Sequence, residues 1–277
     1  MHTVGVVEQA ATGRTSSGLA YEIAGSGEPL VLVHAGVADR RMWEPQWLGF
    51  AASHRVIRYD LRGYGESLPP SGSWSQHADL LDLMTELGIE RAHLVGTSVG
   101  AGIAVEAALA QPSAVASLVL AAPGGALYGT PSDELRSVWH EEVEALDRGD
   151  LDAAVEVNML AWVDGPSRAP EAVDPAIREF VGRMQREAFE LPEWDPEGAP
   201  ESELEPPAYA RLAEIGCWSL VLVGEGDQPV TQQAASHAAS EILGARLEAW
   251  PEVGHMLTLE RPAEFERLVL EFIASVR

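Results

Sequence analysis

Apolar runs of strand length, separated by polar and glycine-rich segments, organise the first 121 residues of the chain. The clearest runs cover residues 30–33, 56–59, 92–95 and 115–121. Continuous apolar runs are typical of parallel strands, because such strands are covered on both faces of the sheet. Between them, as in residues 73–87, apolar side chains recur at helical spacing. This alternation predicts an α/β fold with a mostly parallel sheet flanked by helices.

Two further short runs, at residues 4–8 and 19–23, predict strands at the N-terminal end of the sheet. The segment between them contains TGRTSSG, whose glycines and hydroxyl side chains favour a turn. We therefore expect the chain to begin as a hairpin.

From about residue 125 the pattern changes to helices without a convincing strand. We expect one helix to start at a capping box in residues 130–133, with proline at its first helical position. Two more are expected after Asp150 and after Asp174. Residues 125–207 therefore predict a helical cap, inserted into a core domain made of residues 1–124 and 208–277.

Residues 192–207 contain five prolines and six carboxylates. Proline lacks the backbone N–H that helices and inner strands use, and like charges repel, so we expect a loop or hinge that does not pack compactly. After it the sheet pattern resumes, with strands at 218–223 and 246–250. A last helix is predicted to begin at Pro262.

The stretch LVGTSVGAGIA, residues 94–104, has the pattern of a buried strand, a very tight turn and a buried helix. Gly96 and Gly100 flank Ser98 at a spacing of two residues on each side. Glycine there allows strand and helix to approach closely, which is the physical requirement of a nucleophile elbow. We therefore predict that Ser98 is a nucleophile and that the backbone N–H of Val99 can stabilise an oxyanion.

Ligands of open α/β sheets bind outside the carboxyl ends of the strands, so the residues that follow each predicted strand are candidates for chemistry. Ser98, Asp227 and His255 occupy such positions. A serine is a weak nucleophile unless a base lies beside it and a third group orients that base. The three residues follow one another in the order nucleophile, acid, base, and Glu225 remains an alternative acid.

Composition narrows the possible partners. The 277 residues carry a net charge of −25 without a single lysine, and Cys217 is the sole cysteine. Such an acidic field disfavours nucleic acid and anionic membrane surfaces as partners. One cysteine excludes an intrachain disulfide and a cysteine-rich metal site, and the histidines show no metal-ligand spacing. We therefore expect a cytoplasmic protein without metal, other cofactor or membrane span.

Four segments together resemble the α/β-hydrolase superfamily over nearly the whole chain. They are HAG at 34–36, DLRGYGES at 60–67, GTSVG at 96–100, and GDQPV at 226–230 followed by Gly254-His255. The resemblance is closest to the capped branch of esterases, lactonases and C–C hydrolases. It implies an eight-stranded, mostly parallel sheet with a helical lid over the three catalytic residues.

The segment HAGVADRRMW is similar to the corresponding loop of 3-oxoadipate enol-lactonases. By position, the resemblance implies that Gly36 supplies the second oxyanion N–H, with Val37 as the alternative donor. Ala35 departs from the family, where His-Gly is the commonest pair. His34 is expected to hold this loop through hydrogen bonds.

Other side chains have weaker assignments. The candidates for substrate binding are Val37, Trp43, Trp139 and Trp162. For the three tryptophans, packing in the core is the alternative. Five further residues are expected to be structural: Arg40, Arg41, Asp60, Arg62 and Ser67. For Arg40 and Arg41, contact with an acidic substrate remains the alternative.

These observations predict a cofactor-free serine hydrolase that cleaves a small-molecule carboxylic ester or lactone through an acyl-enzyme on Ser98. Within the same fold, a C–C bond hydrolase, a thioesterase or a haloperoxidase-like enzyme remains open. A protein of another class, which binds a ligand without turnover, is a further alternative. The oligomeric state and the substrate stay open, because the cap shapes the pocket independently of the catalytic residues.

Overall fold

The computed structural model describes residues 10–192 and 198–276, and within these ranges the chain forms one eight-stranded sheet. The strand order is β1-β2-β4-β3-β5-β6-β7-β8. Strand β2 pairs antiparallel with both β1 and β4, and the other neighbours are parallel, which confirms the predicted α/β sheet. The strands are β1 (Ala11–Arg14), β2 (Ala20–Ala24), β3 (Glu28–Val33), β4 (His54–Tyr59), β5 (Ala92–Thr97), β6 (Val115–Ala121), β7 (Trp218–Gly224) and β8 (Arg246–Trp250).

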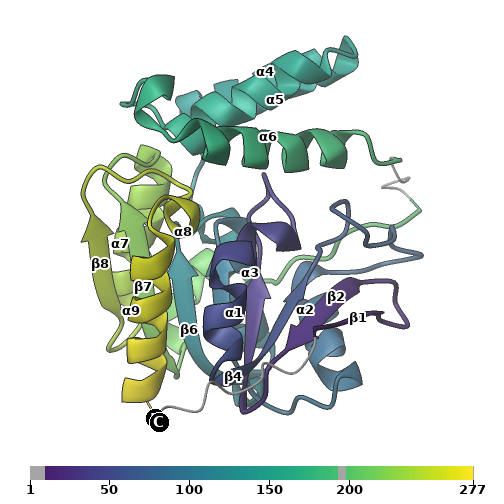
Figure 1. Ribbon diagram of the computed structural model, residues 1–277, viewed down its shortest axis with the longest axis vertical. Coiled ribbons are helices and arrows are strands. Elements are labelled where there is room, and N and C mark those ends of the chain that lie inside the picture. Colours follow the sequence, from purple (N-terminus) through teal and green to yellow (C-terminus); the bar gives the residue numbers. More distant parts are fainter. Residues whose placement is uncertain (1–9, 193–197, 277) are drawn as a thin grey trace, which may run out of the picture.

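Helices cover both faces of the sheet (Figure 1). Helices α1 (Glu44–Ala51) and α9 (Pro262–Ser275) lie on one face, where Trp43 packs on Phe265 with ring centroids 6.0 Å apart. The short helix α8 (Leu257–Glu260) precedes α9. Helices α2 (Gln76–Glu86), α3 (Val99–Ala110) and α7 (Pro229–Glu241) cover the other face.

Strand β7 explains why the apolar runs are continuous. Leu220 and Leu222 belong to the buried cluster on the α1 and α9 face, whereas Val221 and Val223 belong to the cluster on the opposite face. Successive side chains of a strand point to opposite faces, so a strand covered on both sides needs an apolar residue at every position.

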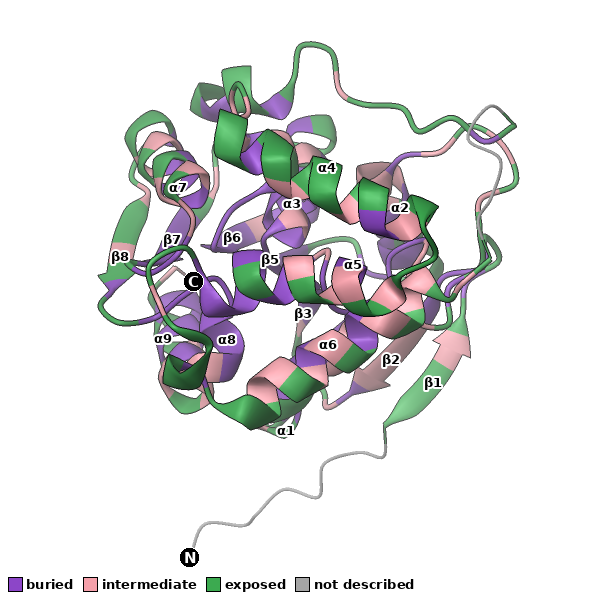
Figure 2. Ribbon diagram, turned by 90° about the horizontal axis from the view of Figure 1, so that it is seen from above, coloured by how far each residue is buried: buried purple, intermediate pink, exposed green. Residues whose placement is uncertain are grey.

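Three helices lie above the carboxyl ends of the strands, in the region predicted as the cap (Figure 1). They are α4 (Asp133–Asp147), α5 (Leu151–Asn158) and α6 (Pro175–Phe189), and α5 continues as a π-helix over Met159–Asp164. Figure 2 shows these helices crossing in front of the sheet when it is seen from above. Within the described part of residues 125–207, there is no named strand and one isolated bridge, between Trp74 and Glu201.

The helix caps of this region follow the prediction at two of three places. Asp150 accepts a hydrogen bond from the N–H of Ala153, and Asp174 accepts one from Ala176, as N-cap residues do. The remaining helix, α4, starts within the predicted residues 130–133, but its N-cap is Ser132, whose hydroxyl accepts from the N–H of Leu135, so the prediction of proline at the first helical position is wrong. Proline therefore precedes the cap and does not occupy the first helical position.

The N-terminal hairpin differs from its prediction. The predicted strand at residues 4–8 lies outside the described residues. The strand that pairs with β2 is β1, which begins at Ala11 and so occupies part of the segment predicted as a turn. It is an exposed edge strand that buries almost no side chain, so its polar sequence carries no strand signal. The turn itself is tight, with the N–H of Gly18 bonded to the carbonyl of Thr15.

The acidic, proline-rich segment is hydrogen-bonded to Trp74 within residues 198–207. Trp74 donates its backbone N–H to Pro200 and its indole N–H to Ala199, and it accepts a hydrogen bond from the N–H of Ser202. These bonds fix the segment beside the start of α2. Over residues 198–207 the segment is a loop with mostly exposed side chains, as predicted.

Across the described ranges, no helix has both the length and the apolar character that crossing a bilayer requires.

The contact between α3 and β3 leads to a prediction about stability. A Cβ added at Gly100 would overlap the backbone carbonyl oxygen of Val33, which cannot move without shifting the strand. We expect Gly100→Ala to lower the free energy of unfolding by about 1–3 kcal/mol, the usual cost of overpacking a dense interior. Denaturant unfolding measures this change. Gly216→Ala is the matched control, since nothing lies within 4 Å of its added Cβ. Equal effects of the two substitutions would contradict the close contact.

Candidate active site

Ser98 lies at the turn between β5 and α3 with φ 57° and ψ −121°, a backbone conformation that non-glycine residues rarely adopt. The turn is held from both sides, since the N–H of Ser98 donates to Ala121 on β6 and its carbonyl accepts from Gly124. Gly96 and Gly100 lie so close that a Cβ on the first would overlap the carbonyl of the second. The local geometry is therefore that of the predicted elbow.

Asp227 and His255 follow β7 and β8, and the structure brings them together in the interior. Nδ1 of His255 lies 3.0 and 2.9 Å from the two carboxylate oxygens of Asp227. A carboxylate can accept but not donate, so Nδ1 carries the proton and Nε2 is left as an acceptor. The N–H of Gln228 donates to the same carboxylate at 2.6 Å. Glu225, the alternative acid, is exposed.

The loop after β3 is anchored by His34. Its Nδ1 donates to the carbonyl of Ala35 at 2.8 Å, and its Nε2 accepts from the N–H of Leu61 at 2.9 Å. Complete burial lowers the pKa of His34, which keeps the ring neutral and able to accept at Nε2. These bonds confirm that His34 holds the loop.

Gly36 and Val99, the predicted oxyanion donors, lie on adjoining segments. A Cβ built on Gly36 would be 3.3 Å from Cγ2 of Val99. Val99 is the first residue of α3, where a backbone N–H has no acceptor within the helix. Both residues line the same cavity as Ser98 and His255.

The charged residues near this loop pair with one another. Arg40 binds Glu22, Asp60 and Glu66, and Arg41 binds Asp39 and Glu187. Arg62 makes two hydrogen bonds to Asp79, and the hydroxyl of Ser67 donates to the backbone carbonyl of Asp60. All of these residues lie outside the cavity lining, in agreement with the structural roles predicted for them.

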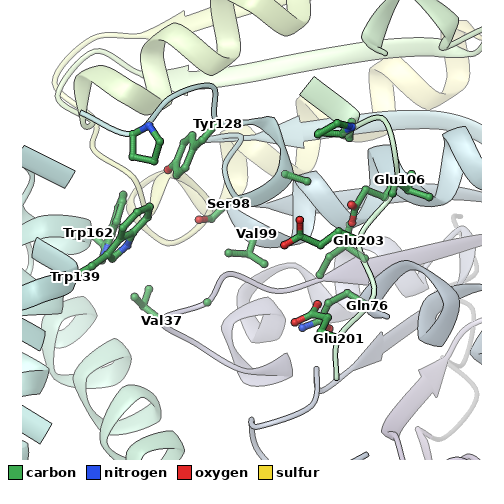
Figure 3. A pocket seen from close by; sticks show the side chains of 18 of the residues that line it. Val37, Gln76, Ser98, Val99, Glu106, Tyr128, Trp139, Trp162, Glu201 and Glu203 are labelled. Atoms are coloured by element: carbon green, nitrogen blue, oxygen red, sulfur yellow. The ribbon is translucent and has the colours of Figure 1, made fainter. Parts of the chain in front are cut away.

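The cavity has a volume of about 720 Å³ and two unlike ends (Figure 3). Val37, Trp139 and Trp162, the candidates for substrate binding, line it on the side of the cap. On the other side of Ser98 lie polar residues that the sequence interpretation did not identify: Gln76, Glu106, Glu201 and Glu203. Trp43 is not part of the lining, since it is fully buried against Phe265.

Trp162 packs directly on His255, with ring centroids 4.9 Å apart. It belongs to the π-helical turn, a local widening that is frequent at functional sites. The cap is fastened beside this contact by Arg168. Its guanidinium donates to the carbonyls of Val163 and Asp164 and forms an ion pair with Glu260, which in turn accepts from the N–H of Gly254. This anchor has no local signal in the sequence, because Glu260 is 92 residues away from Arg168 along the chain.

The polar end of the cavity is strongly acidic. The side chain of Glu106 is 12% exposed, and Glu201 and Glu203 lie at the more exposed rim. Burial, followed by repulsion from the other two carboxylates, raises the pKa of Glu106 to about 7. A fourth carboxylate of the cavity lining, Glu142, lies on α4 as Trp139 does; it accepts a hydrogen bond from Asn158, and burial raises its pKa. Among the described residues that line the cavity there is no arginine.

Comparison with known proteins agrees with this geometry. The family model of the alpha/beta hydrolase family matches residues 30–268, and the chain belongs to this family. A 2-hydroxymuconate semialdehyde hydrolase from Pseudomonas sp. (strain CF600) is 30% identical over 264 residues, which are 91% of this chain and 88% of that protein.

Two solved structures are similar over their full length. A thermophilic esterase from Thermogutta terrifontis, with malate bound, has a TM-score of 0.75 and 25% identity, and the match covers 97% of this chain and 99% of the esterase. Est816, described as an N-acyl homoserine lactone degrading enzyme, has a TM-score of 0.73 and 25% identity, with 95% and 100% covered. The family thus includes esterase and lactonase neighbours of this chain.

The two cavity tryptophans give a prediction that separates packing from substrate contact. Trp162 is 8% exposed and Trp139 is 42% exposed. We expect Trp162→Ala to lower the melting temperature by on the order of 5–10 °C, because it leaves a void beside His255, whereas Trp139→Ala changes it little. Both variants should change the ranking of hydrolase substrates, measured on one panel. An unchanged ranking in both would contradict a role in substrate selection.

Proposed function

We propose that this chain is a serine hydrolase that cleaves a carboxylic ester or lactone through an acyl-enzyme on Ser98. The observation that carries the proposal is the pairing of the buried Asp227 with His255, which lines the same cavity as Ser98. A serine needs a neighbouring base and an orienting acid to act as a nucleophile, and these two residues supply them. The esterase and lactonase neighbours support this substrate class.

In this mechanism, Oγ of Ser98 attacks the substrate carbonyl while Nε2 of His255 takes its proton. The negative charge that develops on the carbonyl oxygen is stabilised by the backbone N–H groups of Gly36 and Val99. His255 then gives the proton to the departing alkoxide, and the C–O bond breaks. Water, activated by the same nitrogen, attacks the acyl-enzyme and releases the acid. Asp227 orients the ring and stabilises its positive charge throughout.

A second candidate is hydrolysis of a carbon–carbon bond. The 30% identical relative acts, by its name, on a semialdehyde, a substrate that contains no ester to hydrolyse. A muconate is also an anion, and an anion gains nothing from a cavity lined by Glu106, Glu142 and two further carboxylates. Hydrolysis of an ester or lactone is therefore the better supported activity.

Replacement of the nucleophile tests the proposal directly. We expect Ser98→Ala to lower turnover of the best ester by on the order of a million-fold, because His255 then has no hydroxyl to deprotonate and no acyl-enzyme can form. Steady-state hydrolysis measures the loss, and labelling by a fluorophosphonate should disappear with it. Ser113→Ala, at an exposed serine, serves as the control. A rate above one tenth of wild type would refute the assignment, and absence of any turnover in the wild type would favour a ligand-binding protein.

The acid is tested against its neighbour. We expect Asp227→Asn to reduce turnover by roughly four orders of magnitude, since His255 loses the group that orients it. Glu225→Gln should change turnover little, because that side chain is exposed. The two rates are compared on one ester at one pH. Equal losses would leave Asp227 without its proposed role, and a larger loss in Glu225→Gln would assign the acid to Glu225.

A further inference from the structure

We propose that the substrate of this site carries a protonated amine, which binds at the acidic end of the cavity while the ester or lactone carbonyl lies at Ser98. This inference rests on the proposed function and adds the substrate class to it. Three features of the acidic end carry it: its continuity with the reactive centre, its uncompensated charge, and a buried acceptor without a donor.

The acidic end is continuous with the reactive centre along one face of α3. Val99, Ile103 and Glu106 all line the cavity, at spacings of four and three residues that place them on the same side of the helix. Seven residues of helix correspond to a rise of about 10 Å between Val99 and Glu106. An aliphatic chain that starts at Ser98 therefore passes two apolar side chains before it meets a carboxylate.

The charge at this end is not neutralised by the protein. Glu106, Glu201 and Glu203 lie on the same side of Ser98 (Figure 3), and repulsion from the other two carboxylates contributes to the raised pKa of Glu106. Among the described residues, one basic side chain lies within 4 Å of the Glu106 carboxylate: His77, whose Nδ1 is 3.9 Å away. Burial lowers the pKa of His77, so this ring is neutral near pH 7. A cation from the substrate would relieve the repulsion.

Charged groups behind the cavity wall do not supply that cation. Arg62 is committed to Asp79, to which it makes hydrogen bonds of 2.6 and 2.8 Å. The negative charge of Asp79 contributes to the raised pKa of Glu201, so pairing with Arg62 does not cancel its effect on the acidic end.

The third feature is Gln76, which lines the same end of the cavity (Figure 3). Its side-chain oxygen is buried and, within the described residues, accepts no hydrogen bond. A buried acceptor without a donor costs free energy, and such groups are rare in native proteins. An ammonium group brings both the N–H donors that this oxygen lacks and the positive charge that the carboxylates lack. A quaternary amine would supply the charge alone.

A matched series of para-nitrophenyl esters tests the inference on the full-length protein. The acyl groups come from ε-aminocaproic acid, heptanoic acid and adipic acid, so chains of similar length end in an ammonium, a methyl or a carboxylate. A second series carries the same end groups on the alcohol side. In one of the two series, we expect kcat/KM for the ammonium ester to exceed that of the neutral ester by on the order of tenfold or more, with the anionic ester slowest.

The carboxylates should determine this ratio. We expect Glu106→Gln to lower the ratio of ammonium to neutral ester, and the triple variant Glu106→Gln, Glu201→Gln, Glu203→Gln to bring it close to one. Glu241→Gln, an exposed glutamate on α7, removes one charge far from the cavity lining and should leave the ratio unchanged. An equal drop in this control would show a general field effect and overturn the assignment to the cavity.

The pH profile gives an independent readout. Since the pKa of Glu106 is about 7, this carboxylate is neutral below that pH and charged above it. The ratio of ammonium to neutral ester should therefore rise as the pH increases from 6 to 8, and Glu106→Gln should flatten the rise. Any pH dependence of the chemical step at Ser98 is common to both esters and cancels in the ratio. A profile that is flat in the wild type would count against Glu106.

Binding separates failure of this inference from failure of the proposed function. Calorimetry with n-heptylammonium and with n-octanol compares a cation with a neutral chain in the absence of turnover. Preferential binding of the cation, lost in the triple variant, supports the acidic subsite even if no ester is hydrolysed. Turnover that depends on Ser98, with neutral esters preferred in both series and no preference for the cation in binding, overturns the inference and leaves the proposed function intact.

Discussion

The structure of the site depends on the close approach of three backbone segments: the ends of β3 and β5 and the start of α3. Gly96 and Gly100 permit this approach, and it forces Ser98 into a positive-φ conformation. The strain persists because hydrogen bonds to Ala121 and Gly124 hold the turn on both sides. The start of α3, its free N–H at Val99 and the floor of the cavity all follow from this one contact.

Charge is distributed unevenly in this acidic chain. The arginines brace the scaffold, as Arg40 does with Asp60, and Arg168 ties the cap to Glu260. The lining of the cavity keeps carboxylates without such partners, above all Glu106. The net charge of −25 therefore has a local consequence, because the arginines that pair with carboxylates elsewhere are absent from the described lining.

Most of the fold is readable from local pattern, because continuous apolar runs and helical spacing report burial directly. The helix and strand order, the turn at Ser98 and the helical character of residues 125–189 were all predictable in this way. The edge strand β1 was not, since an exposed strand carries no apolar signal. The start of the first cap helix also differs in one detail: proline was predicted at its first helical position, but the N-cap is Ser132, so Pro131 precedes the helix.

The sequence by itself determined which residues follow the strands, and hence that Ser98, Asp227 and His255 are the candidates for chemistry. Tertiary structure alone decided what surrounds them. The packing of Trp162 on His255 and the gathering of Glu106 with Glu201 and Glu203 join segments that are far apart in the chain. Local periodicity contains no information about these contacts. They depend on how the cap region, and the segment hydrogen-bonded to Trp74, pack on the sheet.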